Sequence, residues 1–150
     1  IEPWRGPDGG PAHSAENAPM PYLQLDTPFA LPTATKRRLA AAMCETYARM
    51  MSVDIRRISV AIRELGEGGL WRITEAGGTP EPASVLMLDI RRGRPAEVRM
   101  AVAQALCAHC IDILGLAAER LNVEFTQHSG DEMYHPALGG FSPDWHEGEV

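Results

Sequence analysis

Residues 21–32 read PYLQLDTPFALP, and residues 84–95 read SVLMLDIRRGRP. Each stretch has an apolar segment ending in aspartate, with a proline six residues later. The likeness extends further, because residues 21–64 lie over residues 84–127 without a gap when the sequence is shifted by 63 residues. Nine of these 44 positions are identical: Leu23/Leu86, Leu25/Leu88, Asp26/Asp89, Pro32/Pro95, Ala40/Ala103, Ala42/Ala105, Cys44/Cys107, Arg57/Arg120 and Val60/Val123. The shift is too long for a solenoid repeat and indicates a duplicated supersecondary unit.

Each copy predicts a strand, a helix and a second strand. Residues 22–28 alternate apolar and polar, and residues 84–90 are almost continuously apolar, as strands are. Pro32 and Pro95 suit the first turn of a helix, and apolar residues then recur at helical spacing over about 33–52 and 95–115. Period-two strands follow at 58–62 and 121–125. Each unit therefore predicts a parallel strand pair with a right-handed crossover.

Two such units predict an α/β (α+β) fold. The duplicated β-α-β units would form one four-stranded, mostly parallel-paired sheet with two helices on one face. We expect the helix-free face to be apolar and to be covered by oligomerisation. Trp71 and Tyr134, with the glycine pairs 77–78 and 139–140, lie in tails that follow the units and would reach a neighbouring subunit.

Composition limits the function classes. The chain has 150 residues, 45% of them hydrophobic, and a net charge of -6, which fits a globular protein and disfavours nucleic-acid binding. It has no apolar run long enough for a membrane span and no signal peptide, so we expect a cytoplasmic protein. Cys44, Cys107 and Cys110 fall in helical patterns and are expected to be reduced thiols, not metal ligands.

Residues 1–19 are rich in proline and glycine and show no periodicity. We interpret residues 1–20 as a disordered leader or a cloning remnant, followed by one domain over 21–150. Its two units would span 21–83 and 84–141, with a short tail after them. Met20 is a plausible translation start, and its removal would leave Pro21 as the amino-terminal residue.

The loop before the second helix reads Arg91-Arg92-Gly93-Arg94-Pro95. Arginines at a helix N-terminus oppose the helix dipole, so the stability of the helix gives no reason for them. A bound carboxylate or phosphate would give one, since the dipole, the free N–H groups and the guanidinium groups all favour an anion. The alternative is a solvated basic loop or a salt-bridge partner. In the first unit the same loop, residues 28–31, is uncharged.

A proline after Met20 at the start of the first strand, together with the duplicated unit, resembles the tautomerase superfamily. The resemblance covers residues 21–141 and is to the 4-oxalocrotonate tautomerase-like, tautomerase/MIF-like fold. Its two-unit branch includes cis-3-chloroacrylic acid dehalogenase and malonate semialdehyde decarboxylase. It implies a homotrimeric enzyme that needs no cofactor or metal and acts on a small carboxylic acid, with Pro21 as general base or acid.

The resemblance also implies roles for other residues. Arg91 and Arg94 match the R-x-x-R pattern that binds the substrate carboxylate in the dehalogenases, and Arg92 and Arg94 match the R-x-R pattern of the decarboxylase. The water-activating carboxylate of the dehalogenases has no unambiguous counterpart. The remaining candidates are Asp131 and Glu132 for that carboxylate, His135 in its place, Tyr47 for a histidine on the first helix, and Trp71 as a wall of the site or an interface aromatic.

One departure from the family pattern and one rejected metal site bear on the expected function. The family tyrosine of the last strand aligns with Glu124, and a metal site of His128, Asp131 and His135 matches no tight ligand spacing. The hypotheses are therefore tautomerisation of an enol or 2-oxo acid, or hydration or dehalogenation of an unsaturated 3-halo acid. The alternatives are decarboxylase-like activity, or a non-enzymatic trimeric binding module if residues 1–20 remain attached and Pro21 stays acylated.

Overall fold

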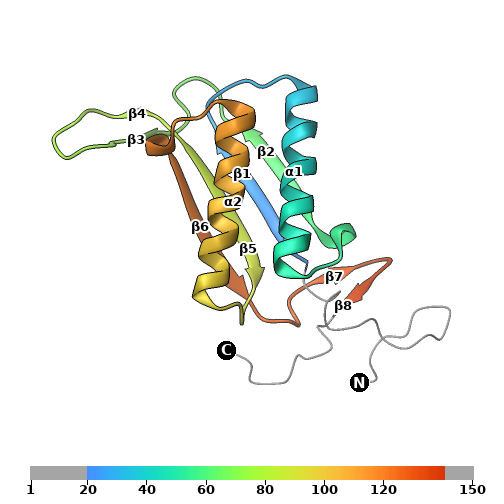
Figure 1. The fold of residues 1–150 in the computed structure, drawn as a ribbon. Helices are drawn as coiled ribbons and strands as arrows, with labels where there is room; N and C mark the ends of the chain where they lie inside the picture. Colours follow the sequence, from blue (N-terminus) through green and yellow to red (C-terminus); the bar gives the residue numbers. More distant parts are fainter. Residues whose placement is uncertain (1–19, 141–150) are drawn as a thin grey trace.

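A computed structural model of the chain describes residues 20–140, which form two β-α-β units (Figure 1). The first unit comprises β1 (Tyr22–Thr27), α1 (Thr33–Met51), the 3-10 turn η2 (Ile55–Arg57) and β2 (Ser59–Glu64). The second comprises β5 (Ser84–Arg91), α2 (Ala96–Leu114), the 3-10 turn η3 (Ala118–Arg120) and β6 (Leu121–His128). A short hairpin follows each unit: β3 (Trp71–Arg72) with β4 (Glu81–Pro82), and β7 (Tyr134–His135) with β8 (Gly139–Gly140).

The 63-residue shift found in the sequence holds in three dimensions. Both helices, both 3-10 turns and the strands β3 and β7 begin and end at positions 63 residues apart. The helices also end alike, at Ser52 and Gly115, which both have a left-handed backbone. The two units are therefore equivalent element by element, and any residue can be compared with the one 63 positions away.

One four-stranded sheet joins the units, in the order β2-β1-β5-β6. The pairs β1–β2 and β5–β6 are parallel, and β1 and β5 run antiparallel between them. Gln24 pairs with its own equivalent Met87, so an approximate two-fold axis passes between them. The axis continues between the helices, where the equivalent residues Thr46 and His109 bring Oγ1 and Nε2 to 2.7 Å. The predicted fold class is confirmed.

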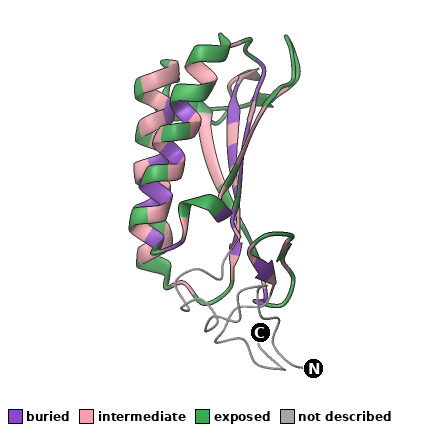
Figure 2. Cartoon of the chain, turned by 90° about the vertical axis from the view of Figure 1, so that its right-hand side faces the viewer, coloured by how far each residue is buried: buried purple, intermediate pink, exposed green. Residues whose placement is uncertain are grey.

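Both helices cover the same face of the sheet, and the core lies between the helix layer and the sheet (Figure 2). Alternate side chains of β1 and β5 point into this core, as the period-two patterns predicted. Burying each large apolar side chain stabilises the fold by about 1.5–3 kcal/mol. The fully buried apolar residues of the strands and helices are Leu23, Leu25, Leu86, Leu88 and Ile90, with Leu39, Met43, Met51, Val102, Leu106 and Cys110.

The helix-free face is mostly polar, so the expectation of a large apolar face is wrong. Strand register and alternation place the following residues on it: Tyr22, Gln24, Asp26, Ser59, Ala61, Arg63, Val85, Met87, Asp89, Arg91, Asn122, Glu124, Thr126 and His128. Alternating strands show that one face is less buried than the other, but not that the second face is apolar. Tyr22 on this face is 41% exposed, but the most exposed aromatic residues among 20–140 are Trp71 and Tyr134, at equivalent positions on the two hairpins.

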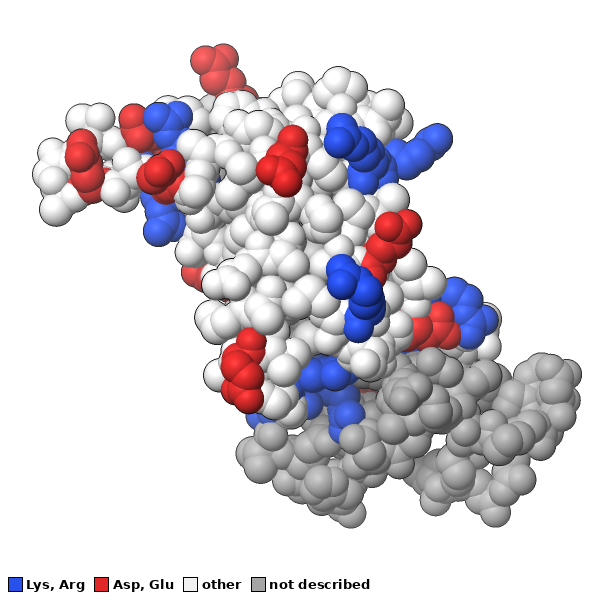
Figure 3. Space-filling view, viewed as in Figure 1, with Lys and Arg blue, Asp and Glu red and all other residues white. Residues whose placement is uncertain are grey.

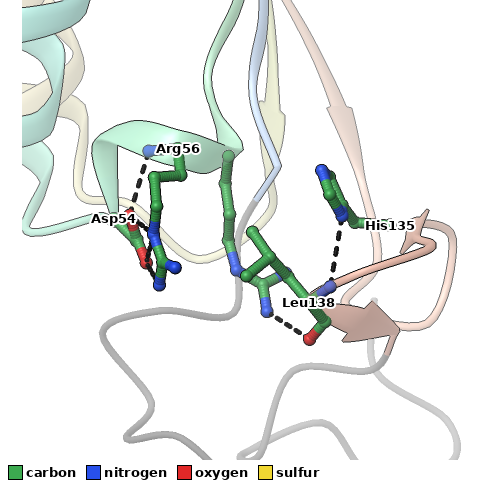
Figure 4. Close-up of polar contacts among 5 residues, drawn as sticks. Asp54, Arg56, His135 and Leu138 are labelled. Carbon is green, nitrogen blue, oxygen red and sulfur yellow. Dashed lines mark hydrogen bonds and ion pairs between the residues drawn. The ribbon is translucent and has the colours of Figure 1, made fainter.

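An arginine of each unit holds the hairpin of the other unit. Arg57 is 5% exposed, and its Nη2 donates to the carbonyl of Leu138 at 2.9 Å. The equivalent Arg120 contacts Glu81 at 3.2 Å in a more exposed ion pair. Figure 4 shows Leu138 held on two sides, since its N–H also bonds to Nδ1 of His135 at 3.1 Å. These tethers explain why arginine occurs at both positions.

The leader predicted over residues 1–20 lies outside the described residues except for Met20. Across residues 20–140, no helix has both the length and the apolar character needed to cross a membrane.

Candidate active site

Pro21 lies at one end of the sheet, immediately before β1. It is buried, and its carbonyl accepts a hydrogen bond from the Ser59 N–H at 3.2 Å. Because Tyr22 pairs with Asp89 in the antiparallel β1–β5 ladder, Pro21 lies beside Ile90 near the end of β5. We call this the Pro21 end of the sheet. The opposite end, where β5 begins at Ser84, is called the Ser84 end.

The arginine loop lies at the Pro21 end, because β5 finishes there at Arg91. The Arg92 N–H donates to the carbonyl of His128 at 2.7 Å, which anchors the loop to the end of β6. Gly93 has a φ of 108°, a backbone conformation that favours glycine, and α2 begins after Pro95. Figure 3 shows basic side chains gathered at the lower end of the described part, beside the beginning of α2.

The two arginines of the R-x-x-R pattern have different surroundings. Strand alternation puts Arg91 in the row of β5 side chains on the helix-free face. Arg94 instead lies near Tyr47 of α1. Burial raises the pKa of the Tyr47 phenol, the positive charge of Arg94 partly opposes that rise, and Asp89 adds to it. Tyr47, which is 2% exposed, is therefore a neutral hydrogen-bond donor at physiological pH and not a base.

A histidine–aspartate pair that the sequence analysis missed lies at the same end. Asp89 Oδ1 accepts a hydrogen bond from Thr126 Oγ1 at 2.7 Å and lies 3.0 Å from His128 Nδ1. The other ring nitrogen, Nε2, lies 3.1 Å from the sulfur of Met133, and the Met20 N–H donates to the same sulfur at 3.0 Å. The imidazole is thus oriented from both sides, next to the residue that precedes Pro21.

Asp131 and Glu132, the candidates for water activation, lie in the turn after β6. Glu132 Oε1 accepts a hydrogen bond from the Ser129 N–H at 3.0 Å, and Asp131 accepts one from the Ser129 hydroxyl. Both carboxylates therefore stabilise their own turn, as short polar side chains near a turn often do.

His135 and Trp71 each bond to groups of their own hairpin segment. His135 accepts hydrogen bonds from the N–H groups of Ala137 and Leu138 inside the β7–β8 hairpin. Trp71 belongs to the hairpin that projects from the Ser84 end (Figure 1), and its Nε1 donates to the Gly68 carbonyl at 2.8 Å. A single chain does not bring Trp71 to Pro21.

The residues considered as metal ligands have separate partners. His128 contacts Asp89, Asp131 contacts Ser129, and His135 contacts backbone amides. Within residues 20–140, no three His, Cys, Asp or Glu side chains form a group that could hold a metal ion. The three cysteines are free thiols, and burial raises the pKa of each.

No family model and no curated protein sequence matches this chain. Solved structures match it closely in fold. N1, a member of the cis-3-chloroacrylic acid dehalogenase family, is 17% identical with a TM-score of 0.70, over 82% of this chain and 85% of that one. Pt0534, whose structure was solved after inactivation by 2-oxo-3-pentynoate, is 20% identical with a TM-score of 0.67, over 81% and 94%. A fused 4-OT that forms a symmetric trimer is 18% identical with a TM-score of 0.67, over 81% and 94%.

The chain and these structures share one class of fold, an α+β arrangement of two β-α-β units that form one sheet. The fold is that of the tautomerase superfamily, as the sequence resemblance implied. At these identities the likeness extends to the fold alone.

Proposed function

We propose that this protein is a tautomerase-superfamily enzyme that uses Pro21, once its nitrogen is free, as a general base or acid on a small carboxylic acid. The observation that carries the proposal is the position of Pro21 beside the end of β5, at the same sheet end as the arginine loop. The start of β1 and the end of β5, which would supply the proton-transferring group and the carboxylate-binding group, meet at one end of the antiparallel β1–β5 ladder.

The chemistry requires a free secondary amine. A chain that begins at Pro21 has one, with an ordinary pKa near ~8. Burial and nearby arginine charges both disfavour its protonated form, so the amine would act as a base near neutral pH. It would remove a proton from the carbon or oxygen of an enol or 2-oxo acid and return it to the other atom. Arg91 and Arg94 would hold the carboxylate, and neutral Tyr47 would donate a hydrogen bond.

Tautomerisation is better supported than hydration or dehalogenation. The latter two reactions need a group that activates water, and the candidates Asp131 and Glu132 are both hydrogen-bonded to Ser129 within their turn. Tautomerisation needs only the transfer of one proton. The decarboxylase-like alternative would use Arg92 and Arg94, and of these the Arg92 side chain is exposed.

We propose that the enzyme works as a homotrimer, like the fused 4-OT that forms a symmetric trimer. The exposed aromatic residues on the hairpins support this, with Trp71 55% exposed and Tyr134 65% exposed. In such an assembly a hairpin from the Ser84 end of one subunit would approach the Pro21 end of the next. Trp71 would then form part of a neighbouring site.

The test compares three proteins: the chain that begins at Pro21, its Pro21→Ala variant and the 150-residue chain. Phenylenolpyruvate tautomerisation is measured from pH 5 to 9. The 150-residue chain should be slower than the short one by about 10²-fold or more, the usual contribution of one general acid–base group. Pro21→Ala should be slowed less, because a primary amine remains. Equal rates for the long and short chains would reject the proline mechanism.

A covalent probe gives an independent measurement. Pt0534 is inactivated by 2-oxo-3-pentynoate. If Pro21 is a reactive amine here, the same compound should add to the short chain and raise its mass by one adduct at Pro21, and the long chain should remain unlabelled there.

The second candidate is a non-enzymatic binding module with residues 1–20 attached. One contact favours it: the Met20 N–H is engaged by Met133, in a site that also involves His128. In that form the Pro21 nitrogen is an amide with no basic lone pair. Carboxylate binding without tautomerase activity in either chain would support this candidate.

A further inference from the structure

Glu64, at the end of β2, occupies a carboxylate-binding position at the Ser84 end. Its Oε2 accepts a hydrogen bond from the Leu31 N–H at 3.3 Å, and its Oε1 forms an ion pair with Lys36 in the first turn of α1. The hydrogen bond from Lys36, followed by that from the Leu31 N–H, lowers the pKa of the Glu64 carboxyl. A backbone amide and a helix cation thus hold a carboxylate that the chain itself supplies.

The second unit repeats this position with one change. Leu31, Lys36 and Glu64 correspond to Arg94, Arg99 and Gln127. The backbone matches, since Thr27 pairs with Glu64 as Ile90 pairs with Gln127. The N–H groups of Lys36 and Arg99 also bond to Pro32 and Pro95 at the same distance, 3.0 Å. The second unit therefore keeps the amide and the cation, but an amide side chain replaces the carboxylate.

Arg99 lacks an internal partner for its charge. It lies three and seven residues before the buried Val102 and Leu106, on the side of α2 that faces the core. Its Nε is buried and makes no hydrogen bond, and no carboxylate among residues 20–140 pairs with it. A buried N–H without a partner costs free energy, and the planar guanidinium group is suited to a carboxylate.

We propose that a carboxylate of the substrate occupies, in the second unit, the place that the Glu64 carboxylate fills in the first, held by Arg99 and the backbone N–H of Arg94. The identity of this ligand as the substrate rests on the proposed function. Pro21, Ile90 and Gln127 lie in one row across three neighbouring strands. At about 4.8 Å between strands, the Cα of Gln127 is about 10 Å from that of Pro21, so the side chains of both residues can contact one small acid.

The test fills the position with an internal carboxylate. Gln127→Glu in the 150-residue chain should form with Arg99 the ion pair that Lys36 and Glu64 form in the first unit. Pyruvate binding, followed by NMR chemical-shift titration, should then weaken about tenfold or more, because a hydrogen-bonded charge pair is lost. Arg99→Gln should cause a similar loss. Thermal unfolding of Gln127→Glu should not occur at a lower temperature, which separates blocked binding from misfolding.

Gln104→Glu is the matched control, since it makes the same chemical change at an exposed position of α2. It should bind pyruvate within about twofold of the parent. Parent-like affinity in both Gln127→Glu and Arg99→Gln would overturn the inference, as would an equal loss in Gln104→Glu. Because this experiment measures binding in a chain with an acylated Pro21, it can succeed or fail independently of the proline mechanism.

Discussion

The two ends of the sheet have the same backbone but differ in which of their charges are paired within the chain. At the Ser84 end, charges are neutralised within the chain: Lys36 pairs with Glu64, and Asp26 pairs with Arg63. At the Pro21 end, the residues equivalent to Glu64 and Arg63 are Gln127 and Thr126, which carry no charge. Duplication of a unit evidently preserves the packing positions, because the core requires them, and leaves the charged positions at each end free to diverge.

The comparison also shows how a site can be recognised without a relative of known function. An internal ion pair in one unit marks a position where the backbone and a helix cation favour an anion. Where the second unit keeps the cation and loses the anion, the position is available to a ligand.

The largest effect concerns the arginines that hold the hairpins. Arg57→Ala should lower the free energy of unfolding by about 2–3 kcal/mol, because it removes a buried guanidinium that donates to the Leu138 carbonyl. Arg120→Ala should cost less than about 1 kcal/mol, since its ion pair with Glu81 is exposed. Urea denaturation of both variants measures the difference. Equal losses would mean that the two tethers do not differ as their burial indicates.

The next effect concerns the loops that precede the helices. Arg94→Ala should weaken binding of a pyruvate-like acid by about 2 kcal/mol, and Arg91→Ala by a smaller amount, with little change in folding. Leu31→Ala is the equivalent substitution at the Ser84 end and should leave the affinity unchanged. Isothermal titration of the three variants would test this. A parent-like affinity for Arg94→Ala would remove the Arg94 side chain from the site.

The smallest effect concerns the helix ends. Ser52 and Gly115 are equivalent and both have a positive φ, 53° and 70°. Because a side chain makes this conformation unfavourable, Ser52→Gly should stabilise the protein by about 0.5–1 kcal/mol, and Gly115→Ser should destabilise it by a similar amount. Thermal or urea unfolding should show the opposite signs. A loss of stability in Ser52→Gly would indicate that the serine side chain contributes a favourable contact.

The fold was predictable from the sequence because its signals are local and are repeated. Period-two and helical patterns predicted the four main strands and both helices, with the largest error at the end of β6, which extends three residues beyond the predicted 121–125. The 63-residue shift related the two units. The same patterns could not show that the helix-free face is polar. That result depends on register, which places Asp26 beside Arg63 and Asp89 beside Thr126. The residue pattern of one strand does not show which strands pair with it or in which register.

The site was predictable only where its residues are close in sequence. The arginine loop is one continuous segment, and Pro21 was found through its position before the first strand. Asp89 and His128 lie on different strands, so only the β5–β6 pairing brings them together. Arg99 is a single charged residue in a helix, where exposure to solvent is the usual expectation. Asp131 and Glu132 were proposed from residue type, and their bonds to Ser129 depend on the turn.

The contact between Thr46 and His109 has a consequence for the design of this fold. A residue on a two-fold axis meets its own copy whenever the two halves of an assembly are identical. Because one polypeptide carries both halves here, a hydroxyl and an imidazole can meet across the axis instead. A symmetrised protein made from two second units would place two histidines face to face, and they would repel each other on protonation. Covalent fusion thus permits a mixed contact that identical subunits cannot make.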